Sequence, residues 1–245
     1  MPAYNERETI TAALRRLCDL LDGQPYDYEI IVVDDGSVDA TSSMALEESQ
    51  NRLGRIKVVQ YQPNMGKGYA LKTGFTHSNG KKIILLDSDL DIDPQAIPRY
   101  VNATALGDVA VGSKWLPVSD YKAPAIRKML SLGFHSLVML LTGVRTRDTQ
   151  TGIKAFRRHA LETIFKMQLV KRYAFDVELM TLANILKLTV VELPVRIHQQ
   201  ARFSLGDVFH MFIELLGIVY RARIIKWYQK NLENHAPIYK PIISL

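Results

Sequence analysis

Four aspartates spaced two residues apart follow an apolar segment of the chain. Asp87, Asp89, Asp91 and Asp93 come directly after residues 83–86. In an extended chain this spacing places side chains on one face, so the carboxylates would converge. Converging negative charges favour a hard cation, and Mg²⁺ or Mn²⁺ held by carboxylates and phosphate oxygens is the usual solution. A solvated acidic turn is the alternative, and Asp93, which a proline follows, has the pattern of a helix N-cap.

Two further polar segments could contact a nucleotide. Residues 34–37 read Asp-Asp-Gly-Ser, and the carboxylate of Asp35 could accept hydrogen bonds from a base or a ribose. Residues 66–68 read Gly-Lys-Gly, which permits close backbone approach and lets Lys67 face a phosphate. Each segment taken alone is equally typical of a surface turn. The second also lacks the spacing of a P-loop or a dinucleotide fingerprint.

An alternation of strands and helices carries these segments in the first half of the chain. Three of the expected strands run directly into the polar segments. Because ligands bind at the carboxyl ends of parallel strands, this arrangement predicts an α/β doubly wound sheet with a site at that edge. The expected strands are residues 29–33, 56–60, 83–86 and 109–111, and the expected helices are about 8–21, 40–52 and 68–77.

The pattern is looser in the second half. We expect an apolar helix over about residues 125–141, a turn over 147–152 and a helix over about 175–186. A strand near 190–195 and a long helix over about 204–230 follow. These elements divide the chain into a catalytic domain, residues 1–195, and a basic, apolar helical tail, residues 196–245.

Composition points to a membrane surface rather than to nucleic acid. The 245 residues are 47% hydrophobic and 23% charged, with a net charge of +6, of which the tail contributes +4. No nucleic-acid-binding motif is present, and the apolar content of the tail favours anionic lipid. The single cysteine, Cys18, predicts no internal disulfide and a cytosolic environment. We expect no secretory signal and no spanning helix, since the apolar stretches 132–144 and 208–220 are shorter than about 20 residues.

The polar segments, in this order and together with the opening Pro-Ala-Tyr-Asn-Glu at residues 2–6, resemble the inverting glycosyltransferase family 2. Residues 148–152 (Asp-Thr-Gln-Thr-Gly) and 173–179 (Tyr-Ala-Phe-Asp-Val-Glu-Leu) are similar to its dolichyl-phosphate glucosyl- and mannosyltransferases, more to the glucosyl branch. The resemblance implies a GT-A fold, a mixed sheet flanked by helices. It also implies that the hydrophobic first strand, which precedes the opening motif in relatives, is missing here.

The resemblance implies a set of donor-site residues. Asp89 and Asp91 would hold Mg²⁺ or Mn²⁺, with Asp87 beside them, although position 91 is often neutral in relatives. Lys67 would lie near the ribose or phosphate of the donor. The nucleotide would contact Pro2, Tyr4, Glu6 and Asp35.

The acceptor side is expected to be cationic. A lipid phosphate is largely dianionic at neutral pH, so it can attack without a protein base. Lys114, Arg127 and Arg202 occupy basic positions where similar enzymes bind the acceptor phosphate. Asp148 is either a general base or the cap of a helix that starts near Thr151. The expected catalytic residues are therefore Asp89, Asp148 and Arg127.

The expected activity is inverting transfer of a hexose, from UDP-glucose or GDP-mannose, to a polyprenyl or dolichyl phosphate. The aromatic and basic residues after Tyr220 predict a peripheral, interfacial helix on the cytoplasmic face of a membrane, and packing on protein is the alternative. Two other functions stay open. One is transfer to a polysaccharide or protein hydroxyl, which requires a base, and the other is non-catalytic nucleotide-sugar binding. The oligomeric state stays open as well.

Overall fold

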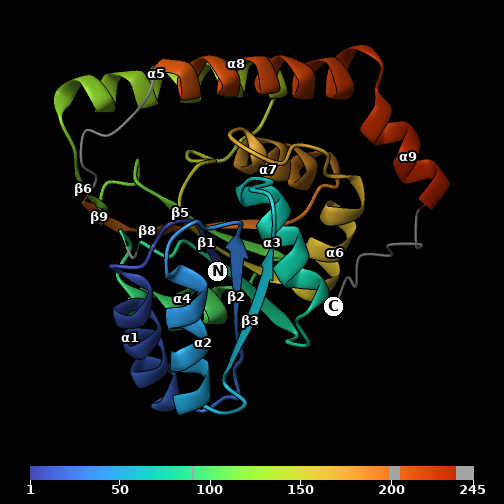
Figure 1. The fold of residues 1–245 in the computed structure, drawn as a ribbon. Helices are drawn as coiled ribbons and strands as arrows, with labels where there is room; N and C mark the ends of the chain where they lie inside the picture. Colours follow the sequence, from blue (N-terminus) through green and yellow to red (C-terminus); the bar gives the residue numbers. More distant parts are fainter. Residues whose placement is uncertain (90, 199–204, 236–245) are drawn as a thin grey trace.

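The computed structural model describes residues 1–89, 91–198 and 205–235. Its first sheet is parallel and consists of β1 (Pro2–Ala3), β2 (Ile30–Asp35) and β3 (Ile56–Tyr61), in that order. Helices α1 (Ile10–Asp22) and α2 (Thr41–Asn51) pack side by side next to this sheet, and α3 (Lys67–Thr76) packs against β2 (Figure 1). All six residues of β2 are buried, which explains its continuous apolar start.

The second sheet is mixed, with the order β4 (Lys82–Leu86), β7 (Ile153–Arg157), β5 (Val109–Ser113), β8 (Val190–Pro194). Strand β7 is antiparallel to β4 and β5, whereas β5 and β8 are parallel. A small third sheet pairs β6 (Asp120–Lys122) with β9 (Arg196–His198). The predicted α/β class with a mixed sheet is therefore confirmed.

A short strand within the opening motif was not predicted. Residues 2–3 form β1, whose Pro2 and Ala3 pair with Val33 and Asp34 of β2. The opening motif is thus fixed beside the carboxyl end of β2. This places it at the same edge as the loops that follow β2 and β4. The hydrophobic strand that was expected to be missing would precede this motif, and that expectation stays a prediction.

Several further elements were not predicted. Helix α4 (Ile97–Ala103) follows the short helix at 94–96 that Asp93 caps, β7 and α6 (Arg158–Met167) follow the turn at 147–152, and β6 and β9 form the small third sheet. The expected helix near Thr151 is wrong, because residues 153–157 form the central strand β7 instead. Asp148 therefore caps no helix there.

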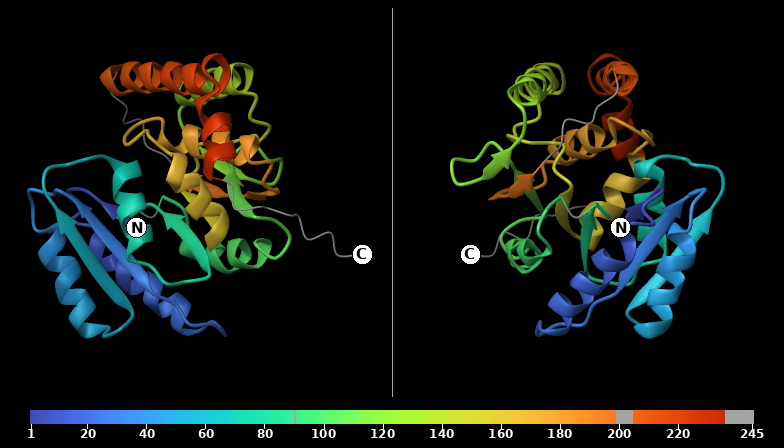
Figure 2. Two further views of the ribbon diagram at one scale, coloured as in Figure 1. Left: turned by 90° about the vertical axis from the view of Figure 1, so that its right-hand side faces the viewer. Right: turned by 60° about the vertical axis from the view of Figure 1, so that its left-hand side comes forward.

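The predicted C-terminal helix is interrupted. It consists of α8 (Leu205–Val219), a π-helical turn (Tyr220–Ile224) and α9 (Trp227–His235). Lys226, with a φ of 51°, makes the break between the turn and α9. Helix α8 lies beside α5 (Ala125–Thr142) across one end of the molecule, above α7 (Phe175–Ile185), as the two views of Figure 2 show.

One side of this helical layer belongs to the core. Val138 of α5 and Leu215 and Ile218 of α8 are buried in the cluster that also contains α7. Within the described residues, α5 is the one helix long and apolar enough to cross a membrane by length and composition, with 18 residues, a mean hydropathy of 1.2 and 11% of them buried. The sequence analysis expected no spanning helix, because the apolar stretches 132–144 and 208–220 are shorter than about 20 residues.

Candidate functional site

Three aspartates line one small pocket at the end of β4. Asp87, Asp89 and Asp91 surround a cavity of about 60 Å³ together with Lys114 and Thr151. Residues 88–89 form a turn, so the extended strand given as the reason for their convergence was wrong. The three aspartates nevertheless share the pocket. Among the described residues, no three His, Cys, Asp or Glu side chains are arranged closely enough to hold a metal ion.

The loop favours binding of positive charge. Partial desolvation raises the pKa of Asp89, and the charge of Asp87 adds to this effect. Desolvation and the charge of Asp89 raise the pKa of Asp91 in the same way, while Arg127 opposes the rise. Asp93 stands apart, because its Oδ1 accepts a hydrogen bond from Gln95 N at 3.1 Å. The predicted capping role of Asp93 is confirmed.

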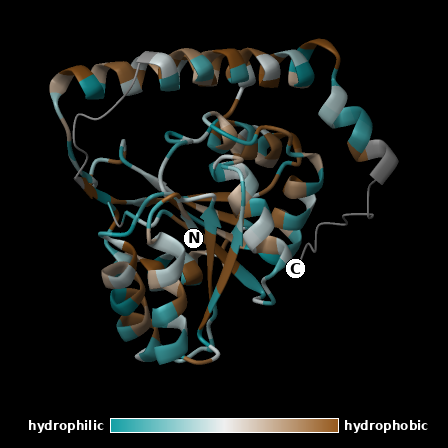
Figure 3. Cartoon of the chain, viewed as in Figure 1, coloured by the Kyte–Doolittle hydropathy of each residue, from teal (hydrophilic) through white to brown (hydrophobic). Residues whose placement is uncertain are grey.

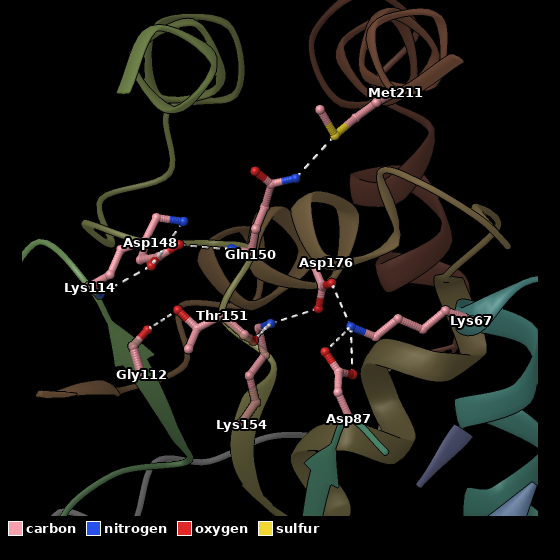
Figure 4. Close-up of polar contacts among 10 residues, drawn as sticks. All are labelled: Lys67, Asp87, Gly112, Lys114, Asp148, Gln150, Thr151, Lys154, Asp176 and Met211. Atoms are coloured by element: carbon pink, nitrogen blue, oxygen red, sulfur yellow. Dashed lines mark hydrogen bonds and ion pairs between the residues drawn. The ribbon is translucent and has the colours of Figure 1, made fainter. Parts of the chain in front are cut away.

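Lys67 binds carboxylates in this structure. Its Nζ lies 2.9 Å from Oδ1 of Asp87 and 3.3 Å from Oδ2 of Asp176 (Figure 4). Asp87 Oδ2 also accepts a hydrogen bond from Lys67 Nζ at 3.1 Å, and the side chain of Lys67 is 32% exposed. The predicted contact between Lys67 and a donor phosphate stays a prediction.

Asp35 organises the loop that precedes α3. Its carboxylate accepts hydrogen bonds from Tyr61 Oη at 2.8 Å, Met65 N at 2.8 Å and Gly66 N at 2.8 Å, and from Asn64 Nδ2 at 3.0 Å. The carboxylate is buried, and protein donors surround both of its oxygens. Its role in holding the Asn64–Gly66 loop was not predicted, and direct contact with a nucleotide stays a prediction.

The opening motif lies next to this loop. Pro2 is buried in β1, whereas Tyr4 is 48% exposed and Glu6 is half-buried. The backbone N–H of Glu6 donates to Thr41 Oγ1 at 2.7 Å, and its carboxylate accepts from Thr9 Oγ1 at 2.5 Å. The structure brings these three predicted nucleotide contacts to the edge of the first sheet.

Lys114 and Asp148 form a buried pair on the other side of the pocket. Lys114 Nζ lies 3.6 Å from Asp148 Oδ2, and the side chains are 8% and 3% exposed. Asp148 also accepts hydrogen bonds from Lys114 N at 3.2 Å and Gln150 N at 3.0 Å. Burial lowers the pKa of Lys114, and the charge of Asp148 opposes that shift.

Arg127, in the first turn of α5, is close to this pair. Its positive charge acts on Asp91, Lys114 and Tyr121, so it lies near both sides of the pocket. Arg202, the third predicted cation, falls outside the described residues. Of the three predicted acceptor cations, Lys114 lines the pocket, and Arg127 is near enough for its charge to act on Asp91 and Lys114.

Three residues of the site were missed from the sequence. Lys154 and Asp176 form a buried ion pair of 2.6 Å next to Lys67 (Figure 4), and Gly152 packs against Asp87. Added to Gly152, a Cβ atom would lie 2.4 Å from Oδ2 of Asp87. Gly152 and Asp176 belong to the two motifs at 148–152 and 173–179, which was the available signal, whereas nothing marked Lys154.

Comparison with known proteins agrees with this geometry. Residues 1–165 match the family described as Glycosyl transferase family 2. The chain is 31% identical over 243 residues to the dolichyl-phosphate beta-glucosyltransferase ALG5D of Trichomonas vaginalis, covering 93% of this chain and 74% of that protein. It is 36% identical over 211 residues to the dolichyl-phosphate beta-glucosyltransferase of Drosophila melanogaster, covering 80% of this chain and 65% of that protein.

Solved structures share the fold. Glucosyl-3-phosphoglycerate synthase from Mycobacterium tuberculosis, in complex with Mn²⁺, UDP and glucosyl-3-phosphoglycerate, superimposes with a TM-score of 0.67 at 20% identity, over 89% of this chain and 76% of that chain. Mannosyl-3-phosphoglycerate synthase from Rubrobacter xylanophilus gives 0.64 at 16% identity, over 99% of this chain and 76% of that chain. With its GT-A fold and the family match over residues 1–165, this chain is an enzyme of glycosyltransferase family 2.

Proposed function

We propose that the enzyme transfers glucose, with inversion, from UDP-glucose to the phosphate of a polyprenyl or dolichyl phosphate at a membrane surface. The observation that carries this proposal is the pocket itself. Asp87, Asp89, Asp91 and Lys114 line it, the charge of Arg127 acts on Asp91 and Lys114, and two apolar helices cover the same end of the molecule. The relatives named dolichyl-phosphate beta-glucosyltransferase support the choice of glucose and of a lipid phosphate.

The donor binds at the carboxylate side in this proposal. Asp89 and Asp91 are the residues that would hold Mg²⁺ or Mn²⁺, because they line one pocket with Asp87. Desolvation and the neighbouring carboxylates raise the pKa of both. A divalent cation held there would supply charge stabilisation to the leaving diphosphate. Asp87 stays bound to Lys67, so its own charge is already balanced.

The acceptor phosphate binds at the cationic side. Lys114 and Arg127 supply two positive charges, and a dianionic phosphate needs no proton removed before it attacks. Asp148 then has the role of holding Lys114, since its carboxylate is buried and accepts hydrogen bonds from two backbone N–H groups. This argues against Asp148 as a base and hence against a hydroxyl acceptor.

The membrane surface is an apolar layer that we define as the exposed hydrophobic side chains of α5, α8 and the π-helical turn. Bands of hydrophobic residues run along both helices in Figure 3. Because one side of each helix packs on the catalytic domain, these helices fit a position in the plane of the interface. The apolar layer comprises Ile126, Met129, Leu130, Leu132, Met139, Leu140, Val208, Phe209, Phe212, Ile213, Leu216, Tyr220 and Ile224.

The proposed layer extends the predicted anchor, the C-terminal tail, to α5. Helix α5 contributes six of its exposed apolar side chains and α8 contributes five, and Arg223 donates a hydrogen bond to Leu140 O at 3.3 Å, which ties the tail to α5. A peripheral position on the cytoplasmic face follows from the proposed nucleotide-sugar donor. The division of the chain at residue 195 stays a prediction.

The test is an assay of transfer to polyprenyl phosphate with radiolabelled UDP-glucose and GDP-mannose, each with Mg²⁺ or Mn²⁺. We expect a lipid-linked product from UDP-glucose that mild acid releases as free glucose. A product from GDP-mannose alone would overturn the choice of donor. Transfer to a glucan or peptide hydroxyl without any lipid product would overturn the choice of acceptor.

A further inference from the structure

A lysine is buried in the centre of the second sheet. Lys154 lies in β7, its side chain is 2% exposed, and its Nζ donates hydrogen bonds to Thr151 O at 2.7 Å and to Asp176 Oδ1 at 2.6 Å. A buried ammonium is costly unless it is paired and fully hydrogen-bonded. An apolar side chain would satisfy the packing of a central strand, so the lysine needs another explanation.

Asp176 connects this lysine to the donor side. Its Oδ1 accepts from Lys154, and its Oδ2 lies 3.3 Å from Lys67 Nζ. Burial opposes a charge on Asp176, but the two ammonium groups outweigh burial and lower the pKa of Asp176. The carboxylate is therefore charged and held from both sides.

These ion pairs continue from Lys67 to Asp87, the first of the aspartates that follow β4. Lys67 Nζ lies 2.9 Å from Asp87 Oδ1, so four side chains of alternating charge run from β7 to the end of β4 (Figure 4). We name Lys154, Asp176, Lys67 and Asp87 the charge relay, in the sense of a chain of contacts. An ammonium group has three N–H donors. Three carboxylate oxygens lie around Lys67 Nζ, namely Asp87 Oδ1 at 2.9 Å, Asp87 Oδ2 at 3.1 Å and Asp176 Oδ2 at 3.3 Å.

The turn before β7 also fixes the position of Asp87, through contacts with Gly152. Asp87 N donates to Gly152 O at 3.2 Å, and the absence of a Cβ at Gly152 leaves room for the Asp87 carboxylate. Lys154 lies two residues further along the same segment. One short segment therefore determines the place of Asp87 both directly and through the charge relay.

We propose that Lys154 and Asp176 are positioning residues of the donor site: they hold the Lys67 ammonium so that it fixes Asp87 and places its positive charge beside the donor diphosphate. This inference rests on the proposed donor and is independent of the acceptor. A purely structural ion pair is the alternative. Replacing such a pair by apolar residues is often neutral for stability, so stability and donor binding can be separated by experiment.

The first variant is Asp176→Asn. Its amide keeps the size of the side chain and one acceptor for Lys154, but it removes the charge that faces Lys67. We expect the dissociation constant of UDP with Mn²⁺, measured by calorimetry, to rise about tenfold, because a charge-assisted contact to the diphosphate is misplaced. The KM for UDP-glucose should rise similarly, while the KM for polyprenyl phosphate changes less than about twofold.

The matched control is Glu162→Gln. It makes the same chemical change on the surface of α6, where Glu162 pairs with Lys166 at 2.9 Å. This variant should bind UDP with Mn²⁺ as the wild type does. A loss of affinity equal to that of Asp176→Asn would show an effect of net charge and overturn the positioning role.

A double variant, Lys154→Met with Asp176→Leu, removes the buried pair without leaving an unpaired charge. We expect it to melt close to the wild type and still to bind UDP with Mn²⁺ about tenfold more weakly. Wild-type affinity in this folded double variant would make the pair structural and overturn the inference. A wild type that binds UDP with Mn²⁺ but transfers nothing to polyprenyl phosphate would refute the proposed acceptor and leave the inference standing. Wild-type protein that binds neither UDP nor GDP would overturn both.

Discussion

The phenolic hydroxyl of Tyr228 donates a hydrogen bond to Oε1 of Glu178, and both side chains are completely buried. Arg221 joins them, with its Nε 2.9 Å from Tyr228 Oη and its Nη2 3.3 Å from Glu178 Oε1. The other oxygen of Glu178 accepts from Leu169 N at 2.9 Å and Val170 N at 2.6 Å. This cluster ties the C-terminal helices to α7, two residues beyond Asp176.

We therefore expect Tyr228→Phe to destabilise the fold. It leaves a buried carboxylate with one donor fewer, which costs about 1 to 3 kcal/mol in the free energy of unfolding. Chemical denaturation measures this cost. Tyr220→Phe, on a side chain that is 51% exposed, is the control and should leave the midpoint unchanged. Equal midpoints for the two variants would mean that the Tyr228 hydroxyl contributes nothing.

Gly152→Ala tests the close contact with Asp87. The new methyl group would lie 2.4 Å from Asp87 Oδ2, so the carboxylate must move away from Lys67. We expect turnover to fall about tenfold or more, since a misplaced donor-site group weakens transition-state stabilisation. Gly133→Ala on α5 is the control, because a Cβ there meets no atom within 4 Å. Unchanged turnover in Gly152→Ala would mean that Asp87 has freedom to move.

The loop with Asp87 and Asp89 could be predicted, because its position depends on the strand that directly precedes it in the sequence. A buried strand that ends in alternating aspartates leads to one edge of a sheet, wherever the later strands lie. This logic located Asp87 and Asp89 even though their backbone forms a turn. It also found Lys67, which follows β3 in the same way.

The charge relay could not be predicted, because its contacts join distant segments. Lys67 and Asp176 are 109 positions apart, and β7 enters the sheet between β4 and β5, which precede it in the chain. A lysine in the short segment 153–157 has the pattern of a solvent-facing residue. Its burial depends on the antiparallel insertion of β7, which local periodicity does not encode. The break at Lys226 was missed for a similar reason, since the apolar pattern continues through it.

Asp89→Ala tests the proposed cation site. Removing this carboxylate should lower Mn²⁺- or Mg²⁺-dependent turnover about a hundredfold or more, because the cation stabilises the leaving diphosphate. Turnover is measured across a range of Mn²⁺ concentrations, with circular dichroism to verify the fold. Asp27→Ala, on a fully exposed side chain, should behave as the wild type. Full turnover by folded Asp89→Ala would exclude Asp89 as a cation ligand.

Single charges placed in the apolar layer test the membrane surface. Phe209→Asp on α8 and Leu140→Asp on α5 should each weaken sedimentation with anionic vesicles, because a carboxylate resists burial and is repelled by the headgroups. Leu106→Asp is the matched control, since Leu106 is 77% exposed but lies after α4, outside the layer. Added salt should weaken binding of the wild type by screening. Equal losses in all three variants would argue against a defined membrane face.

The proposed lipid-phosphate acceptor predicts that Arg127 binds the acceptor and that Asp148 does not act as a base. If Arg127 holds a lipid phosphate, Arg127→Ala should raise the KM for polyprenyl phosphate about tenfold, since a charge-assisted contact is worth about 1.5 to 3 kcal/mol. The dissociation constant of UDP with Mn²⁺ should stay the same. Lys128→Ala, on the exposed neighbour of Arg127, is the control and should change neither quantity.

Asp148→Asn separates a base from a holder of Lys114. Loss of a general base would lower kcat about a hundredfold or more and abolish the rise of activity with pH. Loss of the carboxylate that pairs with Lys114 at 3.6 Å should instead raise the KM for polyprenyl phosphate and leave the shape of the pH profile intact. Because Asp148 is buried and accepts two backbone hydrogen bonds, we expect the second result. An inactive Asp148→Asn beside a fully active Arg127→Ala would reverse the assignment and favour a hydroxyl acceptor that depends on a base.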